Sequence, residues 1–332
     1  MGMPQLAVLV DREPPPNLAA IAELVQVRTA DAAGLPAALE GAEALLTWDF
    51  LTPALAGAWP SADRLRWVHT ASAGVDNVLI PEVAASEVVV TNSRGVFDGA
   101  LAEYVLGLVL AFAKDLPGTW ERQRRKEWQH RDTQRLAGTT AVVVGVGPVG
   151  RTIARLLRAF GVRVHGVGRT ARGDDPDFGS VTASADLAAL LPDADWLVLV
   201  APLTAATRGL VGAAELAALP PTARLINVGR GGLVDEAALA AALAEGRLAG
   251  AALDVFEREP LPPSSPLWHQ PGVLVSPHMS GDVTGWRDEL AEVFLDNLRR
   301  WCAGEPLRNI VDKTVGYVPT PALPSPPADR SE

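Results

Sequence analysis

Short apolar runs alternate with helical stretches in the amino-terminal part of the chain. Residues 17–25 and 37–42 carry apolar side chains at the spacing of one helix face. The apolar runs around them are bounded by turn or cap residues and are predicted to be buried strands: 7–10, 44–47, 65–70 and 88–92. Strands that are apolar throughout and alternate with helices are typical of a parallel sheet with helices on both faces.

The same alternation resumes after residue 138. A strand–helix–strand unit is predicted over 139–169, and later helices at 212–219 and 235–246. Further buried strands are predicted at 196–202, 223–229, 250–256 and 273–278. About six parallel strands in this region would complete a doubly wound sheet.

Two longer helices flank the second sheet. One is predicted to begin at Asp98, as its N-cap, and to end before Pro117. It is apolar around almost its whole circumference, so we expect it to be buried between domains or subunits. The other, 281–304, is amphipathic and long enough to return to the first sheet. The charged run 121–131 is predicted to be a solvated helix face or arm.

Gly145, Gly147 and Gly150 stand between the first strand of the second sheet and an apolar-periodic helix. Glycines at G-x-G-x-x-G spacing in this context are typical of a dinucleotide-binding turn. The first allows the tight turn, the second lets a pyrophosphate approach the backbone, and the third lets the helix pack on the strand. The helix N-terminus then attracts the phosphates. The alternative is a structural turn in a sheet that binds nothing.

These patterns predict an α/β protein of two doubly wound parallel-sheet domains, with a Rossmann cofactor domain inserted into a flavodoxin-like substrate domain. Residues 98–283 are assigned to the Rossmann domain, and residues 1–97 with 284–318 to the substrate domain. Such an insertion is expected to create a cleft with cofactor on one wall and substrate on the other. The Pro-rich residues 319–332 are predicted to be disordered.

Composition narrows the classes of function. The chain has 332 residues, of which 48% are hydrophobic and 20% charged, so it can bury cores and is not a disordered chain. Its net charge of −10 argues against nucleic-acid binding. One cysteine excludes an internal disulfide, and the five scattered histidines form no metal-ligand pattern. No apolar run approaches the ~18 residues of a membrane span. We therefore expect a cytoplasmic protein with no metal, membrane or nucleic-acid partner.

Three chemically active side chains follow strands of the second sheet. Arg230 comes after the strand at 223–229, Glu259 after the next strand, and His278 ends the last one. Ligands bind outside the carboxyl ends of strands in such sheets. An anion-binding arginine, a carboxylate and a proton donor are therefore expected to converge there. Taken singly, each has a plainer alternative as a surface charge, a loop carboxylate or a packed histidine.

The chain resembles the D-isomer-specific 2-hydroxyacid dehydrogenases over nearly its whole length, up to about residue 318. The motifs that carry the resemblance are ASAGVDN (71–77), ALAEYVLG (100–107), GVGPVG (145–150), APLTAATRGL (201–210), INVGRGGLVDE (226–236), ALDVFEREPLP (252–262) and SPHMSG (276–281). Within the family, the pattern is most similar to the NADP-dependent glyoxylate/hydroxypyruvate reductases. Formate dehydrogenases carry glutamine where Glu259 stands.

The resemblance implies roles for individual residues. It makes Arg230, Glu259 and His278 catalytic. Substrate binding is implied for the backbone N–H groups of Ser72, Ala73 and Gly74, and Trp48 is a further candidate that could equally be a core residue. Cofactor binding is implied for Gly145, Gly147, Pro148, Val149, Gly150, Pro202, Thr207, Val228 and Asp254, the last through the nicotinamide amide.

The chemistry of 2-keto acid reduction suits these side chains. The keto carbon takes a hydride, and the forming alkoxide needs a proton that His278 can supply. A carboxylate at Glu259 would keep the imidazole cationic until the proton is needed. Arg230 can bind the carboxylate and keto oxygens in a fixed fork and stabilise the negative charge of the transition state.

The strand that ends near residue 168 indicates which dinucleotide is bound. NAD-dependent domains usually place an acidic residue here for the ribose 2′-hydroxyl, whereas an arginine accommodates the 2′-phosphate of NADP. This chain has Arg169 and Thr170 at the strand end, with Arg172 close behind. The alternative is that these arginines are solvated loop residues. The sequence predicts that NADPH is preferred over NADH.

The predicted function is reduction of a small 2-keto acid, such as glyoxylate or hydroxypyruvate, to its D-2-hydroxy acid by NADPH. A homodimer is expected through the cofactor domains, because the apolar helix after Asp98 cannot face water. The alternative function is a dinucleotide-sensing interaction protein on the same scaffold without significant turnover. A turnover assay separates the two.

Overall fold

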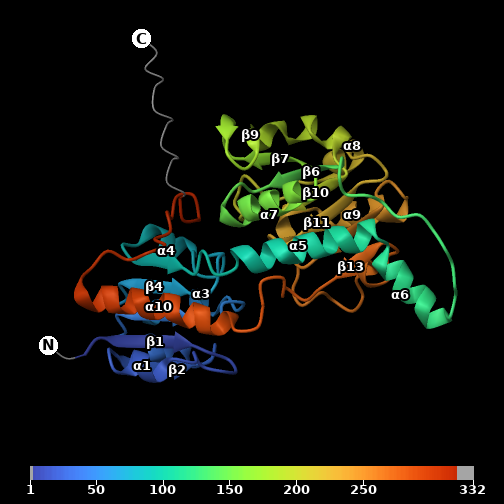
Figure 1. The fold of residues 1–332 in the computed structure, drawn as a ribbon. Coiled ribbons are helices and arrows are strands. Elements are labelled where there is room, and N and C mark those ends of the chain that lie inside the picture. The colour runs from blue at the N-terminus through green and yellow to red at the C-terminus, as the bar shows by residue number, and fades with distance from the viewer. Residues whose placement is uncertain (1–2, 320–332) are drawn as a thin grey trace, which may run out of the picture. The chain divides into compact units, whose positions relative to one another are not determined.

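The computed structural model describes residues 3–319, which form two compact units (Figure 1). The first unit contains the described residues up to Ser93 together with those from Val293 on. The second runs from Arg94 to Glu292. The unit boundaries therefore lie four residues before and nine residues after the boundaries at 97/98 and 283/284 that the sequence suggests. Of the predicted disordered tail, residues 320–332 lie outside the described part of the chain.

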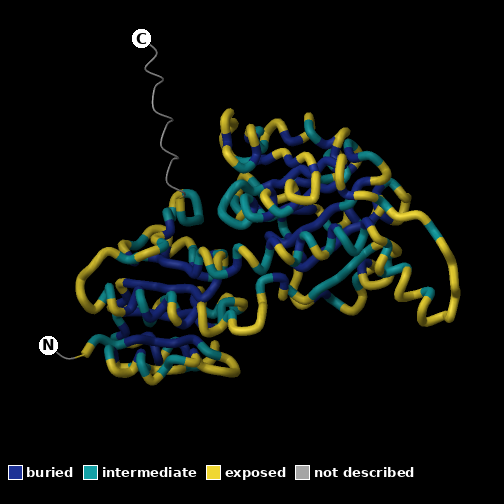
Figure 2. Tube along the Cα trace, in the orientation of Figure 1, coloured by how far each residue is buried: buried dark blue, intermediate teal, exposed yellow. Residues whose placement is uncertain are grey.

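The first unit is built on a five-stranded, wholly parallel sheet of order β2-β1-β3-β4-β5. This is the flavodoxin-type order, so the predicted fold class is confirmed for this unit. The strands are β1 (Gln5–Leu9), β2 (Gln26–Ala30), β3 (Ala44–Thr47), β4 (Trp67–Thr70) and β5 (Val89–Asn92). In Figure 2, the strands other than the edge strand β2 are the buried part of the unit.

Helices cover both faces of this sheet. They are α1 (Leu18–Ala22), α2 (Leu35–Leu39), α3 (Ala54–Ala58), α4 (Pro81–Ala85) and the second part of α10 (Trp286–Ala303). Alternate strand residues such as Val68 and Val90 join Leu39 and Val83 in one core. On the other face, Trp67 stacks on Phe294 of α10, with ring centroids 5.5 Å apart. Burial of both sheet faces explains why these strands are apolar throughout.

The edge strand β2 is absent from the elements that the sequence predicts. Its sequence QVRTA is mostly exposed, with no fully buried residue. An edge strand borders water and is paired on one side only, so it carries no apolar run to reveal it. Backbone pairing with β1 from Gln5 to Leu9 defines it instead.

The second unit holds an eight-stranded sheet of order β13-β12-β11-β10-β6-β7-β9-β8. The order around β6 is that of a Rossmann fold, which confirms the predicted class. The strands are β6 (Thr140–Val144), β7 (Arg163–Gly168), β8 (Arg172–Asp175), β9 (Gly179–Ala183), β10 (Trp196–Leu199), β11 (Arg224–Asn227), β12 (Gly250–Leu253) and β13 (Val273–Val275). All pairings are parallel except β8 with β9.

Two apolar cores sandwich this sheet. The helices are α5 (Asp98–Ala113), α6 (Leu116–Arg125), α7 (Pro148–Ala159), α8 (Ala213–Ala218) and α9 (Glu236–Ala244), with the first part of α10. One core packs α5 and α7 on the face that carries Val143 and Val198. The other packs α8 and α9 on the face that carries Val142 and Leu197.

Two details differ from the sequence-based predictions. Phe97, not Asp98, is the N-cap of α5, and Asp98 is the first helical residue, where its charge suits the helix dipole. Helix α10 begins at Trp286, so residues 281–285 are a loop that carries site residues. The charged run 121–131 is largely exposed, as predicted; it ends α6 and continues into the segment after it, where Arg131 Nε donates to Asp115 at 2.6 Å.

No helix between residues 3 and 319 is long and apolar enough to cross a membrane. The same part of the chain has no cluster of three or more histidine, cysteine or acidic side chains that could hold a metal ion.

Candidate active site

The predicted catalytic residues follow three neighbouring strands of the second unit. Strands β11, β12 and β13 are adjacent and parallel, so their carboxyl ends share one edge of the sheet. Arg230 lies three residues after β11, Glu259 six after β12 and His278 three after β13. The structure therefore brings all three to the edge where ligands bind in such sheets.

The Arg230 loop is held by its neighbours. Asn227, at the end of β11, accepts from Gly229 N at 3.1 Å and donates to Arg230 O at 2.9 Å. A Cβ on Gly231 would lie 1.8 Å from the carbonyl carbon of Phe256, so only glycine allows this close approach. The contact brings the Arg230 loop against the segment that leads to Glu259. The sequence analysis did not single out Asn227. The signal that could have found it is an asparagine at the end of an otherwise apolar strand.

Glu259 and His278 form the central pair of the site. His278 Nδ1 and Glu259 Oε2 are 2.7 Å apart, and Glu259 Oε1 accepts from Phe256 N at 2.9 Å. Both carboxylate oxygens are thus engaged, which fixes the orientation of the imidazole. His278 itself has a left-handed backbone, with φ of 53°, which is uncommon for a residue other than glycine.

Glu259 is ionised in this setting. Burial works to raise its pKa, but the hydrogen bonds from His278 and Phe256 N, together with the charges of His278 and Arg230, outweigh burial and lower it. The positive charge of Arg230 and the ionised carboxylate of Glu259 thus lie at the same edge of the sheet.

Asp254 anchors the loop that carries His278. Its buried carboxylate accepts from Ser276 Oγ at 2.6 Å, Met279 N at 3.0 Å and Ser280 N at 2.9 Å. Its carbonyl accepts from His278 N at 2.8 Å. The residue predicted to contact the nicotinamide thus also holds the backbone on both sides of the histidine.

A second acidic residue near His278 escaped the sequence reasoning. Burial raises the pKa of Asp282, with His278 lowering it, Asp254 raising it and Arg287 lowering it. In the sequence, its position four residues after His278 is the one feature that could have marked Asp282 as a site residue.

The three glycines of the predicted dinucleotide turn have distinct surroundings. Gly145 has φ of +116°, and a Cβ there would lie 2.7 Å from Ala201 N. A Cβ on Gly150 would lie 1.8 Å from Gly145 O, so this glycine allows α7 to pack on the turn. A Cβ on Gly147 would meet no atom within 4 Å. It would project into open space beside the N-terminus of α7, whose first two residues are Pro148 and Val149.

The other residues implied in cofactor binding lie on loops after β10 and β11. Val228 is buried, with its N–H bonded to Leu199 O at 3.1 Å. Thr207 Oγ1 donates to Pro202 O at 2.7 Å and accepts from Thr204 N at 2.8 Å. The Thr207 hydroxyl therefore closes the 202–207 loop on itself.

The end of β7 presents Arg169 and Thr170 at the surface, as a ligand site would need. Arg172 has a partner within the chain: its Nε and Nη2 donate to Asp175 Oδ2 at 3.1 and 2.8 Å. Asp175 also accepts two hydrogen bonds from Arg151, the residue after Gly150. Burial works to raise the pKa of Asp175, but the hydrogen bonds from Arg151 and Arg172 hold it well below its usual range.

In the first unit, residues 72–74 form a loop directly beyond β4. Its three carbonyl groups are all bonded: Ser72 O accepts from Ser93 N at 2.9 Å, Ala73 O from Asn92 Nδ2 at 2.6 Å and Gly74 O from Ser72 Oγ at 2.6 Å. The N–H groups of Ser72, Ala73 and Gly74 have no acceptor among residues 3–319. Successive unpaired N–H groups of this kind suit an anion.

Trp48 lies in the core of the first unit. It is 9% exposed, and its Nε1 donates to Glu13 O at 2.9 Å. The ring of Trp48, rather than its N–H, is what a substrate could touch.

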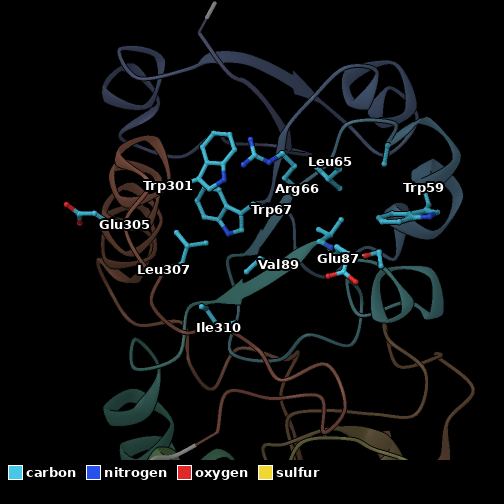
Figure 3. A pocket seen from close by; sticks show the side chains of 14 residues that line it. Trp59, Leu65, Arg66, Trp67, Glu87, Val89, Trp301, Glu305, Leu307 and Ile310 are labelled. Carbon is cyan, nitrogen blue, oxygen red and sulfur yellow. Dashed lines mark hydrogen bonds between the residues drawn. The ribbon is translucent and has the colours of Figure 1, made fainter. Parts of the chain in front are cut away.

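A hollow of about 720 Å³ in the first unit is lined by none of these residues (Figure 3). It opens at the amino ends of β4 and β5, whereas residues 72–74 follow the carboxyl end of β4. Trp301 lines it beside Trp67, with ring centroids 5.7 Å apart, and the Arg66 guanidinium lies 5.9 Å from the Trp301 ring. No predicted site residue lines this hollow.

Comparison with known proteins decides the family. The sequence profile of the D-isomer specific 2-hydroxyacid dehydrogenase, NAD binding domain, matches residues 106–280. The chain belongs to the D-isomer-specific 2-hydroxyacid dehydrogenase family. It is accordingly an NAD(P)-dependent oxidoreductase of 2-hydroxy and 2-keto acids.

Members of this family with known names or structures are similar along most of the chain. Glyoxylate reductase of Thermococcus gammatolerans is 34% identical over 272 residues, which are 79% of this chain and 81% of that protein. A family member from Xanthobacter autotrophicus, solved with NADPH and MES, has 34% identity and a TM-score of 0.81, covering 95% of this chain and 100% of that one. NADPH-dependent glyoxylate/hydroxypyruvate reductase from Sinorhizobium meliloti, solved with NADP and sulfate, has 31% identity and a TM-score of 0.81, with the same coverage.

Proposed function

We propose that this dehydrogenase reduces a small 2-keto acid of the glyoxylate or hydroxypyruvate class to the D-2-hydroxy acid, with NADPH preferred and His278 as general acid. The observation that carries the proposal is the 2.7 Å contact between His278 Nδ1 and Glu259 Oε2, with the charge of Arg230 in range.

His278 donates from the nitrogen that Glu259 leaves available. Because Nδ1 is bonded to the carboxylate, Nε2 is the atom that can reach a substrate oxygen. The ionised Glu259 stabilises the imidazolium before the proton leaves from Nε2. The ring is then neutral and keeps its Nδ1–H bond to Glu259. A bound nicotinamide dinucleotide supplies the hydride.

Arg230 binds the substrate and stabilises the alkoxide. Its planar guanidinium can bind two oxygens of a 2-keto acid at once. The negative charge that grows on the keto oxygen strengthens this interaction in the transition state. Asn227 and the close packing of Gly231 hold the loop in place, so little reorganisation is needed during the reaction.

The substrate carboxylate is assigned to the N–H groups of Ser72, Ala73 and Gly74. The carbonyl groups of the same three residues all accept hydrogen bonds, so the loop has a defined orientation without a ligand. Hydrogen bonds from N–H groups to an ionised carboxylate are about twice as strong as neutral ones.

The second unit fits a dinucleotide. The open space at Gly147 and the first turn of α7 suit a pyrophosphate, since the first N–H groups of a helix lack intrahelical acceptors. Among residues 3–319, Asp254 Oδ2 accepts one hydrogen bond, from Ser280 N, so it retains capacity for the nicotinamide amide. Arg169 and Thr170, exposed at the end of β7, are assigned to the 2′-phosphate. The Xanthobacter and Sinorhizobium structures contain NADPH and NADP.

The test is a turnover assay with a panel of 2-keto acids, each with NADPH and with NADH. The expected result is rapid oxidation of NADPH by glyoxylate or hydroxypyruvate, and a D-hydroxy product. Dinucleotide binding without turnover of any 2-keto acid would instead indicate a sensing protein on this scaffold.

We assign the homodimer contact to the cofactor unit. Beside the buried stripe of α5, further apolar residues pack against the core but stay partly exposed: Leu101, Tyr104, Leu106, Leu108, Leu110 and Phe112. Further along, Trp120 is 60% exposed and Trp128 fully exposed. Large exposed apolar side chains of this kind are typical of residues that a partner subunit covers.

A further inference from the structure

A buried row of polar side chains lies behind the 72–74 loop in the first unit. His69 is completely buried on β4, and Thr91 and Ser93, on β5 and just beyond it, are also buried. Polar groups in a core cost free energy unless they are hydrogen-bonded. Three such residues beside the predicted carboxylate site therefore need an explanation.

The hydrogen bonds among these residues run in one direction. Trp67 Nε1 can only donate, and it bonds to Thr91 Oγ1 at 2.8 Å. If the Thr91 hydroxyl then donates to His69 Nδ1, also at 2.8 Å, the imidazole proton lies on Nε2 and points to Ser93 Oγ at 3.3 Å. Ser93 Oγ in turn donates to Thr70 O at 3.2 Å. This order gives every proton an acceptor.

Ser93, the last residue of the row, is hydrogen-bonded to the backbone at the start of the 72–74 loop. Ser93 bonds twice to it, through Oγ to Thr70 O and through its N–H to Ser72 O at 2.9 Å. Thr70 Oγ1 also lies 3.0 Å from Ser72 Oγ, which itself donates to Gly74 O. The direction in which the loop N–H groups point therefore depends on the position of Ser93, and Ser93 is fixed by His69.

We infer that His69 is a positioning residue for substrate recognition: through Ser93 it holds the N–H groups of Ser72, Ala73 and Gly74 in the orientation that binds the substrate carboxylate. The inference rests on the proposed assignment of these N–H groups to the carboxylate. Burial lowers the pKa of His69 to about 3, so the imidazole is neutral and the donor order is constant at working pH.

The experiment compares His69→Phe with His69→Gln. Phenylalanine fills the space beside Phe294, whose ring centroid is 5.3 Å away, but has no hydrogen bond for Ser93. Glutamine can still donate toward Ser93. We expect His69→Phe to raise KM for the 2-keto acid about tenfold, equivalent to about 1.4 kcal/mol. The kcat and the dissociation constant of NADPH should change less than twofold, and glutamine should restore most of the KM.

A second readout isolates the carboxylate. The ratio of kcat/KM for glyoxylate to that for its uncharged amide should fall in His69→Phe, because only the acid uses the oriented N–H groups fully. Val68→Ala is the matched control. Val68 is buried on the opposite face of β4, so its truncation weakens the packing of the same strand without touching His69. It should leave the ratio unchanged. Ser93→Ala, which removes only the hydroxyl, should reproduce the effect if His69→Phe does not fold.

Equal acid-to-amide ratios in the wild type and in the His69→Phe or Ser93→Ala protein would overturn the inference. If the wild type turns over no 2-keto acid, the proposed function fails, and the inference is tested by calorimetric titration of oxalate instead. The positioning role then requires weaker oxalate binding in the Phe and Ala variants than in Val68→Ala, and equal binding refutes it.

Discussion

Arg172 donates two hydrogen bonds to the buried carboxylate of Asp175, which also receives two from Arg151. The sequence places Arg172 among the residues for a 2′-phosphate, but much of its charge is already matched by this carboxylate. Arg169 is exposed directly beyond β7, at the position assigned to the 2′-phosphate. We therefore expect Arg172 to contribute less than Arg169 to cofactor choice.

Arg169→Ala should reduce the preference for NADPH over NADH much more than Arg172→Ala. We expect the wild type to prefer NADPH by at least about tenfold in kcat/KM, or about 1.4 kcal/mol. Arg169→Asp should reverse or abolish this preference, because a carboxylate repels the 2′-phosphate and binds the ribose hydroxyl of NAD. The measurement is kcat/KM for both cofactors at fixed ionic strength. Equal values for NADPH and NADH in the wild type would contradict the assignment.

Gly147→Val should abolish tight NADPH binding while leaving the fold intact. A Cβ at this position meets no atom within 4 Å, and the valine side chain would extend into the space assigned to the pyrophosphate. The dissociation constant should rise more than about tenfold, the equivalent of about 1.4 kcal/mol, with little change in Tm. Gly150→Ala is the contrasting variant, because its Cβ would overlap Gly145 O and should lower Tm. Unchanged NADPH binding in Gly147→Val would place the pyrophosphate elsewhere.

His278→Asn should lower kcat by about two to four orders of magnitude, the usual contribution of a general acid. NADPH should bind nearly as in the wild type, because the 276–280 loop is held by Asp254 rather than by the imidazole. Stopped-flow turnover and a fluorescence titration of NADPH measure the two effects. Normal turnover in a folded variant would remove His278 from the chemistry.

Acid should destabilise the protein partly through His69. Its pKa is about 3 in the folded chain and near 6.5 when unfolded, so below about 6.5 the unfolded state binds the proton more readily. The free energy of unfolding should fall as the pH decreases from 6.5 toward 3, and this residue adds no further loss below that range. Between pH 7 and pH 5, His69 should lower the free energy of unfolding by about 2 kcal/mol. Denaturant unfolding at fixed protein concentration should show a smaller decrease in His69→Gln, and an equal decrease would refute the prediction.

Gly107→Arg should convert the homodimer to a monomer. Gly107 is an exposed residue of α5, and a Cβ there meets no atom of its own chain within 4 Å, so the variant should fold. A bulky charge at the proposed interface should block association. Gly57→Arg is the matched control in the first unit, where a Cβ also meets no atom. Light scattering at micromolar concentration gives the mass, and a monomeric wild type would refute the dimer.

Periodicity was enough to locate most of this fold. The strands with both faces buried, such as β4 and β10, are apolar throughout and could be recognised one by one. The glycine turn could be recognised from its fixed spacing, and at Gly145 and Gly150 the backbone leaves no room for a side chain. Arg230, Glu259 and His278 could be grouped because the ends of parallel strands meet at one edge.

Other features depend on contacts that the sequence does not encode locally. Strands β2, β8 and β9 lie at or near sheet edges, where exposed polar residues carry no periodic signal. The pairing of Arg172 with Asp175 is decided by an antiparallel hairpin and by Arg151 from another element. His69 gains its position only because β4 and β5 pair in register, which sets it opposite Thr91. Local patterns determine which elements form, whereas partners distant in sequence are chosen by packing, because burial requires each polar group to find a neighbour in three dimensions.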